Sequence, residues 1–290
     1  MNIKLATRKS KLAQVQTEYV MGLLKENFDL DSEKLLIVTE GDKRLDVSLN
    51  KIGGKGLFTK DIELALINEE GDAAIHSMKD VPYEMNEIFE LAAMPEREDV
   101  RDVFIGNKGI HFRELPQGAV IGTSSLRREK QLKMLRPDIK TVPIRGNVQT
   151  RLKKIETENL HGIILAAAGL KRLGMEDVIT DYFHPMDMVP AIGQGALGIQ
   201  IVSKSKNADI FRKLDNNKVR ICVEAERAYM RELNGGCHIC IGAHATLHGD
   251  KMNIIGIYEL NGEVVKKRIS GHKDNGKELG RELARKILEG

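Results

Sequence analysis

Apolar residues in the first third of the chain alternate between short continuous runs and helical spacing. The continuous runs at 3–6, 34–38 and 72–77 predict buried strands. Between them, Ser10 can cap a helix that continues to about residue 27 and would place four residues on one face: Leu12, Val15, Tyr19 and Leu23. A second helix, capped by Thr59, would bury Ile62, Ala65 and Leu66 and stop near Gly71. This alternation predicts an α/β unit.

A second α/β unit is predicted after the charged segment 95–102. Three strand–helix junctions follow one another, at 119–135, 141–155 and 161–174, and cations stand at each of them: Arg127 and Arg128, Arg145 and Arg151, Lys171 and Arg172. Helix N-termini and arginines both bind anions. One such arginine is typical of a solvated helix, but three junctions at the same sheet edge predict a polyanion-binding cleft.

The pattern changes again toward the end of the chain. The Gly-rich apolar stretch 189–199 is typical of a return crossing between the two units. From about residue 217 the sequence predicts a helix with Cys222 on its apolar side, a turn, antiparallel strands separated by glycine turns, and a closing helix. A chain of 290 residues exceeds the size at which one core usually stops growing, so two or three domains are expected.

Composition narrows the class of protein. Hydrophobic residues at 41% and charged residues at 30% are typical of a soluble globular protein. The first residues contain no apolar core of a secretory signal, and the apolar run at 162–170 is far shorter than the ~18 residues of a membrane span. A net charge of +3 and 4% aromatic residues argue against nucleic-acid binding. Three cysteines within one short region indicate a reducing cytoplasm rather than a disulfide framework.

The segment IHSMKDVP places Lys79 and Asp80 at the end of a predicted strand. Such a pair is usually a solvated surface pair, but ligands of open α/β sheets bind just beyond the carboxyl ends of strands, which favours a catalytic carboxylate. The polar, Gly-rich connection 41–58 is long and typical of a lid or a disordered loop. Its GGKG lacks the spacing of a nucleotide-binding phosphate loop.

The turn GGCHICIG allows three interpretations. Cys237 and Cys240 with the nearby His238, His244 and His248 suggest zinc, but a second pair at ligand spacing is missing. A redox CxxC is disfavoured because the motif does not open a helix after a first strand. The third interpretation makes Cys237 a nucleophile or attachment point, since two glycines before it leave its sulfur uncrowded.

Ten segments in order resemble those of one family: ATRKSKLA, KIGGKGLFTKDIE, HSMKDVP, EREDVRD, GTSSLRR, RGNVQTRL, AAAGLKRLG, PAIGQGALGI, AERA and NGGCHICIGAHA. The chain resembles the porphobilinogen deaminase (hydroxymethylbilane synthase) family from residue 5 to about 246. The resemblance implies a monomeric transferase of haem biosynthesis that deaminates four porphobilinogen molecules, couples them head to tail into hydroxymethylbilane and releases ammonia. It also implies a dipyrromethane cofactor held by a thioether to Cys237.

The resemblance implies a fold as well. Two domains similar to type II periplasmic binding proteins are joined by hinges and followed by a small C-terminal α/β domain with an antiparallel sheet. The expected boundaries are 1–95 with 196–215 for the first domain, 101–190 for the second and 217–290 for the third. The part after residue 246 matches the family weakly, and its assignment depends on its own alternation.

The same resemblance implies roles for individual residues. Asp80 would be the catalytic carboxylate, stabilising cationic pyrroles and moving protons. Cofactor carboxylates would be held by Lys79, Ser10, Thr123, Ser125, Arg127, Arg128 and Arg172. The incoming ring or growing chain would be bound by Arg8, Arg145, Arg151 and Gln194. A lid would carry Lys51, Lys55 and Phe58, and no metal is expected.

Two rival functions remain at this point. A non-catalytic anion-binding module of the periplasmic type would have a similar cationic cleft, but it predicts a signal peptide and no accessible thiol. A zinc protein is the second rival, and metal analysis would decide it. The chain departs from the family at Cys240, where a proline is usual, so the uniqueness of the Cys237 thiol is the one feature placed in doubt.

Overall fold

The computed structural model describes residues 2–39, 60–82, 84–235 and 239–289, and the chain divides into two compact units. Unit 1 consists of Met1–Arg97 and Ala196–Arg220, and unit 2 consists of Glu98–Gly195 and Ile221–Gly290. Unit 1 therefore contains the whole predicted first domain, while unit 2 contains the second and most of the third. The finer division into three domains stays a prediction.

Unit 1 is built on a five-stranded mixed sheet in the order β2-β1-β3-β10-β4. Its strands are β1 (Ile3–Arg8), β2 (Ser32–Ile37), β3 (Ala73–Ser77), β4 (Phe89–Ala93) and β10 (Leu197–Val202). β1 runs parallel to β2 and β3, and β10 runs antiparallel to β3 and β4. The helices are α1 (Lys11–Phe28), α4 (Lys60–Ile67) and α8 (Ala208–Arg212). Apolar side chains of α1 and α4 belong to separate cores, so each helix covers its own part of the sheet.

Helix α1 confirms the predicted element and part of its predicted face. Ser10 caps it, and its Oγ accepts the Ala13 N–H at 3.3 Å. The buried residues are Gln16, Thr17, Val20 and Leu24, whereas Tyr19 is 38% exposed. Of the predicted face, Leu12, Val15 and Leu23 are partly buried and Leu23 packs against the core, whereas Tyr19 lies outside it. The Thr17 hydroxyl donates to the Ala13 carbonyl at 3.0 Å, which lets a polar residue pack inward.

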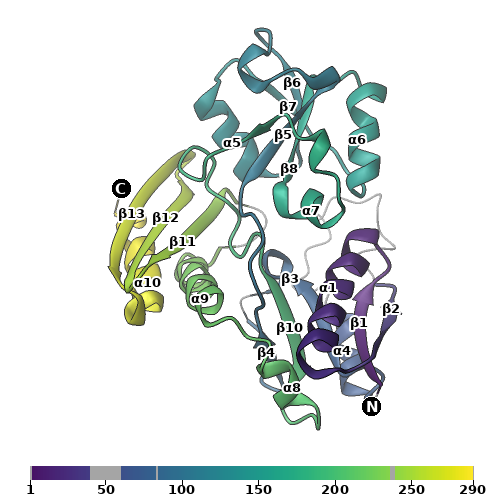
Figure 1. The fold of residues 1–290 in the computed structure, drawn as a ribbon. Helices are drawn as coiled ribbons and strands as arrows, with labels where there is room; N and C mark the ends of the chain where they lie inside the picture. Colours follow the sequence, from purple (N-terminus) through teal and green to yellow (C-terminus); the bar gives the residue numbers. More distant parts are fainter. Residues whose placement is uncertain (1, 40–59, 83, 236–238, 290) are drawn as a thin grey trace. The chain divides into compact units, whose positions relative to one another are not determined.

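Unit 2 contains a second five-stranded mixed sheet in the order β7-β6-β8-β5-β9. Its strands are β5 (Asp102–Gly106), β6 (Val120–Gly122), β7 (Lys140–Val142), β8 (Gly162–Ala166) and β9 (Asp181–Tyr182), and its helices are α5 (Leu126–Leu135), α6 (Val148–Thr157) and α7 (Ala167–Arg172). Leu132 of α5 packs with Phe104 and Ile164, whereas Ile155 of α6 packs with their strand neighbours Ile105 and Ile163. The two helices therefore cover opposite faces of this sheet (Figure 1).

The end of the chain forms a three-stranded antiparallel sheet in unit 2. It consists of β11 (Ile241–His248), β12 (Lys251–Leu260) and β13 (Glu263–His272), and it packs with α9 (Asn217–Glu232) and α10 (Gly276–Leu288). The buried Tyr229 of α9 donates its hydroxyl to the Ile257 carbonyl at 2.8 Å. Single-turn 3₁₀ helices complete the described elements: η1 (Met78–Asp80), η2 (Asn107–Gly109), η3 (Phe112–Glu114), η4 (Glu176–Val178) and η5 (Lys273–Asn275).

These elements confirm the predicted fold class, which combines two α/β sheets with a small antiparallel sheet covered by helices (Figure 1). Strands of the first two sheets are mixed in direction because β10 and β5 run against their neighbours. Among the described residues, no helix combines the length and the apolar character that crossing a membrane requires.

Candidate functional site

The turn that carries Asp80 is held in place by its first residue, the buried Met78. β3 ends at Ser77, and η1 follows it directly. Met78 is 1% exposed, and its N–H donates to the Ala196 carbonyl at 3.0 Å. Its sulfur packs directly against Gly198 of β10, and a side chain at that position would displace it. The anchored turn presents Lys79 and Asp80 as exposed side chains at the carboxyl end of β3.

A buried imidazole lies behind this turn. His76, on β3, is 8% exposed, and its Nε2 lies 2.8 Å from Oε1 of Gln200 on β10. Burial lowers the pKa of His76 to about 4, against the upward effects of the Gln200 hydrogen bond and the Asp80 charge. The charge of Arg8, at the end of β1, lowers it further. Unit 1 thus brings the charges of Asp80 and Arg8 within electrostatic range of one buried ring.

Unit 2 buries a carboxylate between the two arginines that open α5. Asp102 is fully buried, and its Oδ2 accepts from Arg127 Nη1 at 2.6 Å. Its Oδ1 accepts from Arg128 Nε at 3.0 Å and Nη2 at 2.7 Å. The two guanidinium groups also donate to backbone carbonyls, Arg127 to Val189 at 2.6 Å and Arg128 to Ile164 at 2.9 Å. Both predicted cofactor ligands are therefore rigidly held parts of the interior.

Several arginines gather around Asp102 and the turn before α6. Burial raises the pKa of Asp102, but the positive charges of Arg127 and Arg128 outweigh it and bring the pKa down to about 2. Burial lowers the pKa of Arg151, and the charges of Arg128 and Arg145 lower it further. The charges of Arg128 and Arg145 therefore both act on Arg151. Arginines gathered in a partly buried site favour an anion as their ligand.

Two turns bring these arginines together. Ser125 caps α5 by accepting the Arg128 N–H at 3.4 Å, and the Thr123 hydroxyl accepts the Ser125 N–H at 3.2 Å. Asn147 caps α6 in the same way, accepting the Thr150 N–H at 2.8 Å. Thr123 and Ser125, both predicted cofactor ligands, thus serve the local turn as well.

The turn before α6 requires a glycine. Gly146 has a φ of +112°, and a Cβ added there would lie 2.6 Å from Cγ2 of Thr150. Its carbonyl accepts from Arg151 Nε at 2.8 Å, which directs the guanidinium back toward the start of the helix. Arg145 and Arg151, the predicted substrate ligands, are thereby held on one turn.

Two further predicted ligands lie where segments 98–102 and 191–195 meet in unit 2. Gln194 is 1% exposed, and its Nε2 donates to the Val100 carbonyl at 2.7 Å and to Asp102 Oδ1 at 3.1 Å. Arg172 donates from Nη2 to the Gly195 carbonyl at 2.7 Å. Gln194 therefore belongs to the Asp102 cluster, whereas Arg172 bonds to the neighbouring backbone.

The cysteine turn is only partly described. Cys237, His238 and the predicted lid residues Lys51, Lys55 and Phe58 lie outside the described residues. Cys240 is fully buried, and burial raises the pKa of its thiol to about 11, as expected for an inward-facing, unreactive cysteine. Within residues 2–39, 60–82, 84–235 and 239–289, no group of three or more His, Cys, Asp or Glu side chains is arranged to hold a metal ion.

Sequence reasoning missed the buried partners of the site. Asp102 and the pair His76–Gln200 were not singled out, although Asp102 stands directly before an apolar run and His76 interrupts one. A charged residue at the edge of a buried strand is a usable signal, because burying it requires a partner of opposite charge. The identity of that partner is not visible in the sequence.

We expect Asp102→Asn to lower the free energy of unfolding by about 3–5 kcal/mol, because two buried arginines lose their counter-charge. Denaturant titration at pH 7 measures this change. Glu129→Gln is the matched control on the same helix. It breaks only the surface pair with Lys133, at 2.7 Å, and is expected to cost less than about 1 kcal/mol.

Wild type and Asp102→Asn also give a test of the pH dependence of stability. The pKa of Asp102 is depressed in the folded state, so its stabilisation is present above the unfolded value of about 3.9 and is lost as pH falls through about 2. The difference in unfolding free energy between wild type and Asp102→Asn should therefore shrink between pH 4 and pH 2. A constant difference over this range would contradict the ion-pair assignment.

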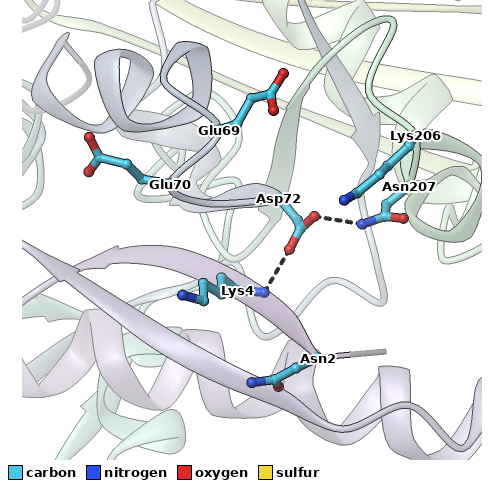
Figure 2. A pocket seen from close by; sticks show the side chains of 7 residues that line it. All are labelled: Asn2, Lys4, Glu69, Glu70, Asp72, Lys206 and Asn207. Atoms are coloured by element: carbon cyan, nitrogen blue, oxygen red, sulfur yellow. Dashed lines mark hydrogen bonds between the residues drawn. The ribbon is translucent and has the colours of Figure 1, made fainter.

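A pocket of about 260 Å³ lies elsewhere in unit 1, at the opposite end of β3 from Asp80. Figure 2 shows Asp72 at its centre, accepting the backbone N–H of Lys4 at 2.8 Å and the side-chain amide of Asn207. Its other lining residues are Asn2, Glu69, Glu70 and Lys206. None of the predicted site residues lines this pocket, and Asp72 there ties β1 and the start of α8 to β3.

Comparison with known proteins agrees with the resemblance. The family model "Porphobilinogen deaminase, dipyromethane cofactor binding domain" matches residues 3–210, and "Porphobilinogen deaminase, C-terminal domain" matches residues 220–289. Porphobilinogen deaminase of Clostridium acetobutylicum is 60% identical over 289 residues, covering 100% of this chain and 99% of the relative. That of Clostridium perfringens is 61% identical over 288 residues, covering 99% of each.

Solved structures are more distant. The methionine-binding protein MetQ covers 76% of this chain and 92% of its own at 12% identity, with a TM-score of 0.47. The family assignment is carried by the sequence comparisons, which extend over both units and include the weakly matching C-terminal part. The chain belongs to the porphobilinogen deaminase family.

Proposed function

We propose that this chain deaminates porphobilinogen and couples four molecules head to tail into hydroxymethylbilane, releasing ammonia. The observation that carries the proposal is the gathering of arginines at the starts of α5 and α6 in unit 2, where the charges of Arg128 and Arg145 both act on Arg151. Porphobilinogen carries an acetate and a propionate on its pyrrole ring, so an oligomer of it is a polyanion. Arginines bind carboxylates through paired N–H donors, which makes this cluster suitable for such a chain.

The same cluster fits the dipyrromethane cofactor of the family, whose two rings bring four carboxylates. Arg127 and Arg128 are already bonded to Asp102, so their contribution is the net charge of the triad together with the rigidity of the α5 N-terminus. Further donors to the cofactor would be Lys79, Ser10, Thr123, Ser125 and Arg172, with Cys237 as the attachment point. When bound, the cofactor supplies the pyrrole carbon on which the product chain begins.

Arg145 and Arg151 are proposed to bind the carboxylates of the incoming ring or the growing chain. Arg151 is held by the Gly146 carbonyl through Nε, which leaves its Nη groups for a ligand. Gln194 stiffens the cluster through Asp102, and Arg8 adds a cation in unit 1. Lys51, Lys55 and Phe58 keep their predicted role in a lid.

Asp80 is proposed as the catalytic residue. When the C–N bond of porphobilinogen breaks, the electron pair leaves with the nitrogen and the remaining ring is cationic. A carboxylate beside the pyrrole N–H can stabilise this cation, and it can take up the proton that the coupled ring later loses. The exposed position of Asp80 on an anchored turn supports this role, because the side chain can reach a ligand while its backbone stays fixed.

We further propose that the chain acts as a monomer in the cytoplasm and divides into three domains at the boundaries expected from the family. Cys240 is a buried free thiol, which supports a reducing compartment. The separate cores of the two sheets in unit 2 support the third domain.

The test of the proposal is turnover of porphobilinogen by the purified chain, with ammonia and hydroxymethylbilane as measured products. Within this assay, we expect Arg151→Gln to raise KM roughly tenfold, because one carboxylate contact of a charged pair is lost. Lys153→Gln removes an exposed cation from the same helix and should leave KM unchanged. Equal effects of both variants would show that only net charge matters, and absence of turnover in wild type would refute the proposal.

A further inference from the structure

A line of three hydrogen-bonded side chains runs through unit 1 behind the turn of Asp80. It begins at His76, continues through Gln200 and ends at Glu63 on α4. The His76 Nε2 to Gln200 Oε1 distance is 2.8 Å, and Gln200 Nε2 donates to Glu63 Oε1 at 3.0 Å. Gln200 is 2% exposed, so this amide has no solvent to exchange partners with.

The line determines which ring nitrogen of His76 donates to Gln200. A carboxylate accepts hydrogen bonds only, so Glu63 must face the NH₂ group of Gln200 and the amide oxygen must face His76. Nε2 of His76 therefore carries the hydrogen. The partner of the ring is a neutral amide, with the carboxylate one side chain further away. A carboxylate in direct contact would favour the imidazolium strongly, whereas the hydrogen bond to an amide raises the pKa of His76 less than burial lowers it, and the ring stays neutral.

The charges around His76 indicate why a charged ring would be unfavourable at this position. The charges that act on His76 are those of Asp80, from the turn after β3, and Arg8, from β1. Glu63, from α4, lies beyond Gln200. An imidazolium four residues before Asp80 would be a fixed counter-ion for that carboxylate. It would compete with the cationic pyrroles that Asp80 is proposed to stabilise.

We propose that His76 is a positioning residue, a buried imidazole that stays neutral because its partner is the Gln200 amide and not a carboxylate, so that the carboxylate of Asp80 is not paired with a permanent cation from its own strand. This inference rests on the proposed role of Asp80. It further requires that the amide of Gln200 contacts His76 and that the carboxylate of Glu63 contacts Gln200 rather than His76.

The experiment exchanges the acid and the amide. The double variant Glu63→Gln/Gln200→Glu keeps composition, net charge and a donor for both hydrogen bonds of the line, although it loses the contact of Gln200 Nε2 with Met85 Sδ at 3.3 Å, and it puts the carboxylate against His76 Nε2. We expect His76 to become an imidazolium near neutral pH in this variant. Because the neutral ring is the active form, kcat should fall roughly tenfold as pH drops from 9 to 6, with KM little changed. In wild type, protonation of His76 should cause no such fall of kcat between pH 9 and pH 6.

A matched control makes the same exchange at the other end of β3. Asp72 and Asn207 are also a hydrogen-bonded acid and amide in unit 1, and they line the pocket of Figure 2. Asp72→Asn/Asn207→Asp keeps an acceptor for the Lys4 N–H and should leave the pH dependence of kcat as in wild type. An equal change in both double variants would show a general effect of acid–amide exchange and overturn the inference.

Titration of the histidine ring by NMR, with His76 assigned through His76→Gln, supplies a readout that needs no folded double variant. In wild type His76 should stay neutral above pH 6, and titration between pH 6 and 8 would overturn the inference. So would a charged His76 in the exchanged variant with a wild-type pH profile of kcat. If Asp80→Asn kept wild-type turnover, the proposed catalytic role of Asp80 would fail, and absence of turnover in wild type would refute the proposed function; both results are independent of the exchange.

Discussion

Asp80→Asn is expected to lower kcat for porphobilinogen consumption by about a thousandfold, because general acid–base and charge stabilisation by one carboxylate typically contribute 10²–10⁴. The asparagine fits the same space, and Asp80 is exposed, so the fold and the attached cofactor should be unaffected. The measurement is kcat from product formation, together with the intact mass and the thermal midpoint of the variant.

Glu87→Gln is the control for this substitution. Glu87 is an exposed carboxylate in unit 1, seven residues further along the chain, and its removal should leave kcat within about twofold of wild type. Near wild-type turnover in Asp80→Asn would remove Asp80 from the mechanism. A variant that lost its cofactor would instead indicate a binding role.

The strands and helices near the site were largely predictable from local pattern. Ser10 and Ser125 stand before helical spacings, and both cap the helices that they were expected to begin or precede. The apolar run before Lys79 is β3, as expected. These features are set by nearest neighbours along the chain, which is why one sequence suffices to predict them.

Burial and pairing were less predictable. The buried side of α1 includes Gln16 and Thr17, and the Thr17 hydroxyl is satisfied by a hydrogen bond within the helix, which apolar spacing does not reveal. Arg127 and Arg128 were expected to face a ligand, yet both are bonded to Asp102, which is 25 and 26 residues away in the chain. His76 and Gln200 are separated by 124 residues. Such pairs depend on which strands become neighbours, and the local pattern contains no information about that.

Cys237→Ala is expected to abolish cofactor attachment and turnover completely, because a thioether requires the sulfur. Cys237 lies outside the described residues, so this prediction comes from its family position alone. Cys240→Ala is the matched control. Its thiol is buried with a raised pKa, and its loss should leave the pyrrole adduct in place at the cost of a small cavity. An adduct retained in Cys237→Ala and lost in Cys240→Ala would reverse the assignment.

Intact mass spectrometry of the purified chain tests the central claim most directly, because it reports the cofactor without relying on activity. The account predicts that wild type exceeds the mass of its 290 residues by two condensed pyrrole units. Asp80→Asn and Cys240→Ala should carry the same addition, and Cys237→Ala should have the mass of the bare chain. An active wild-type protein with the mass of the bare chain would contradict the account.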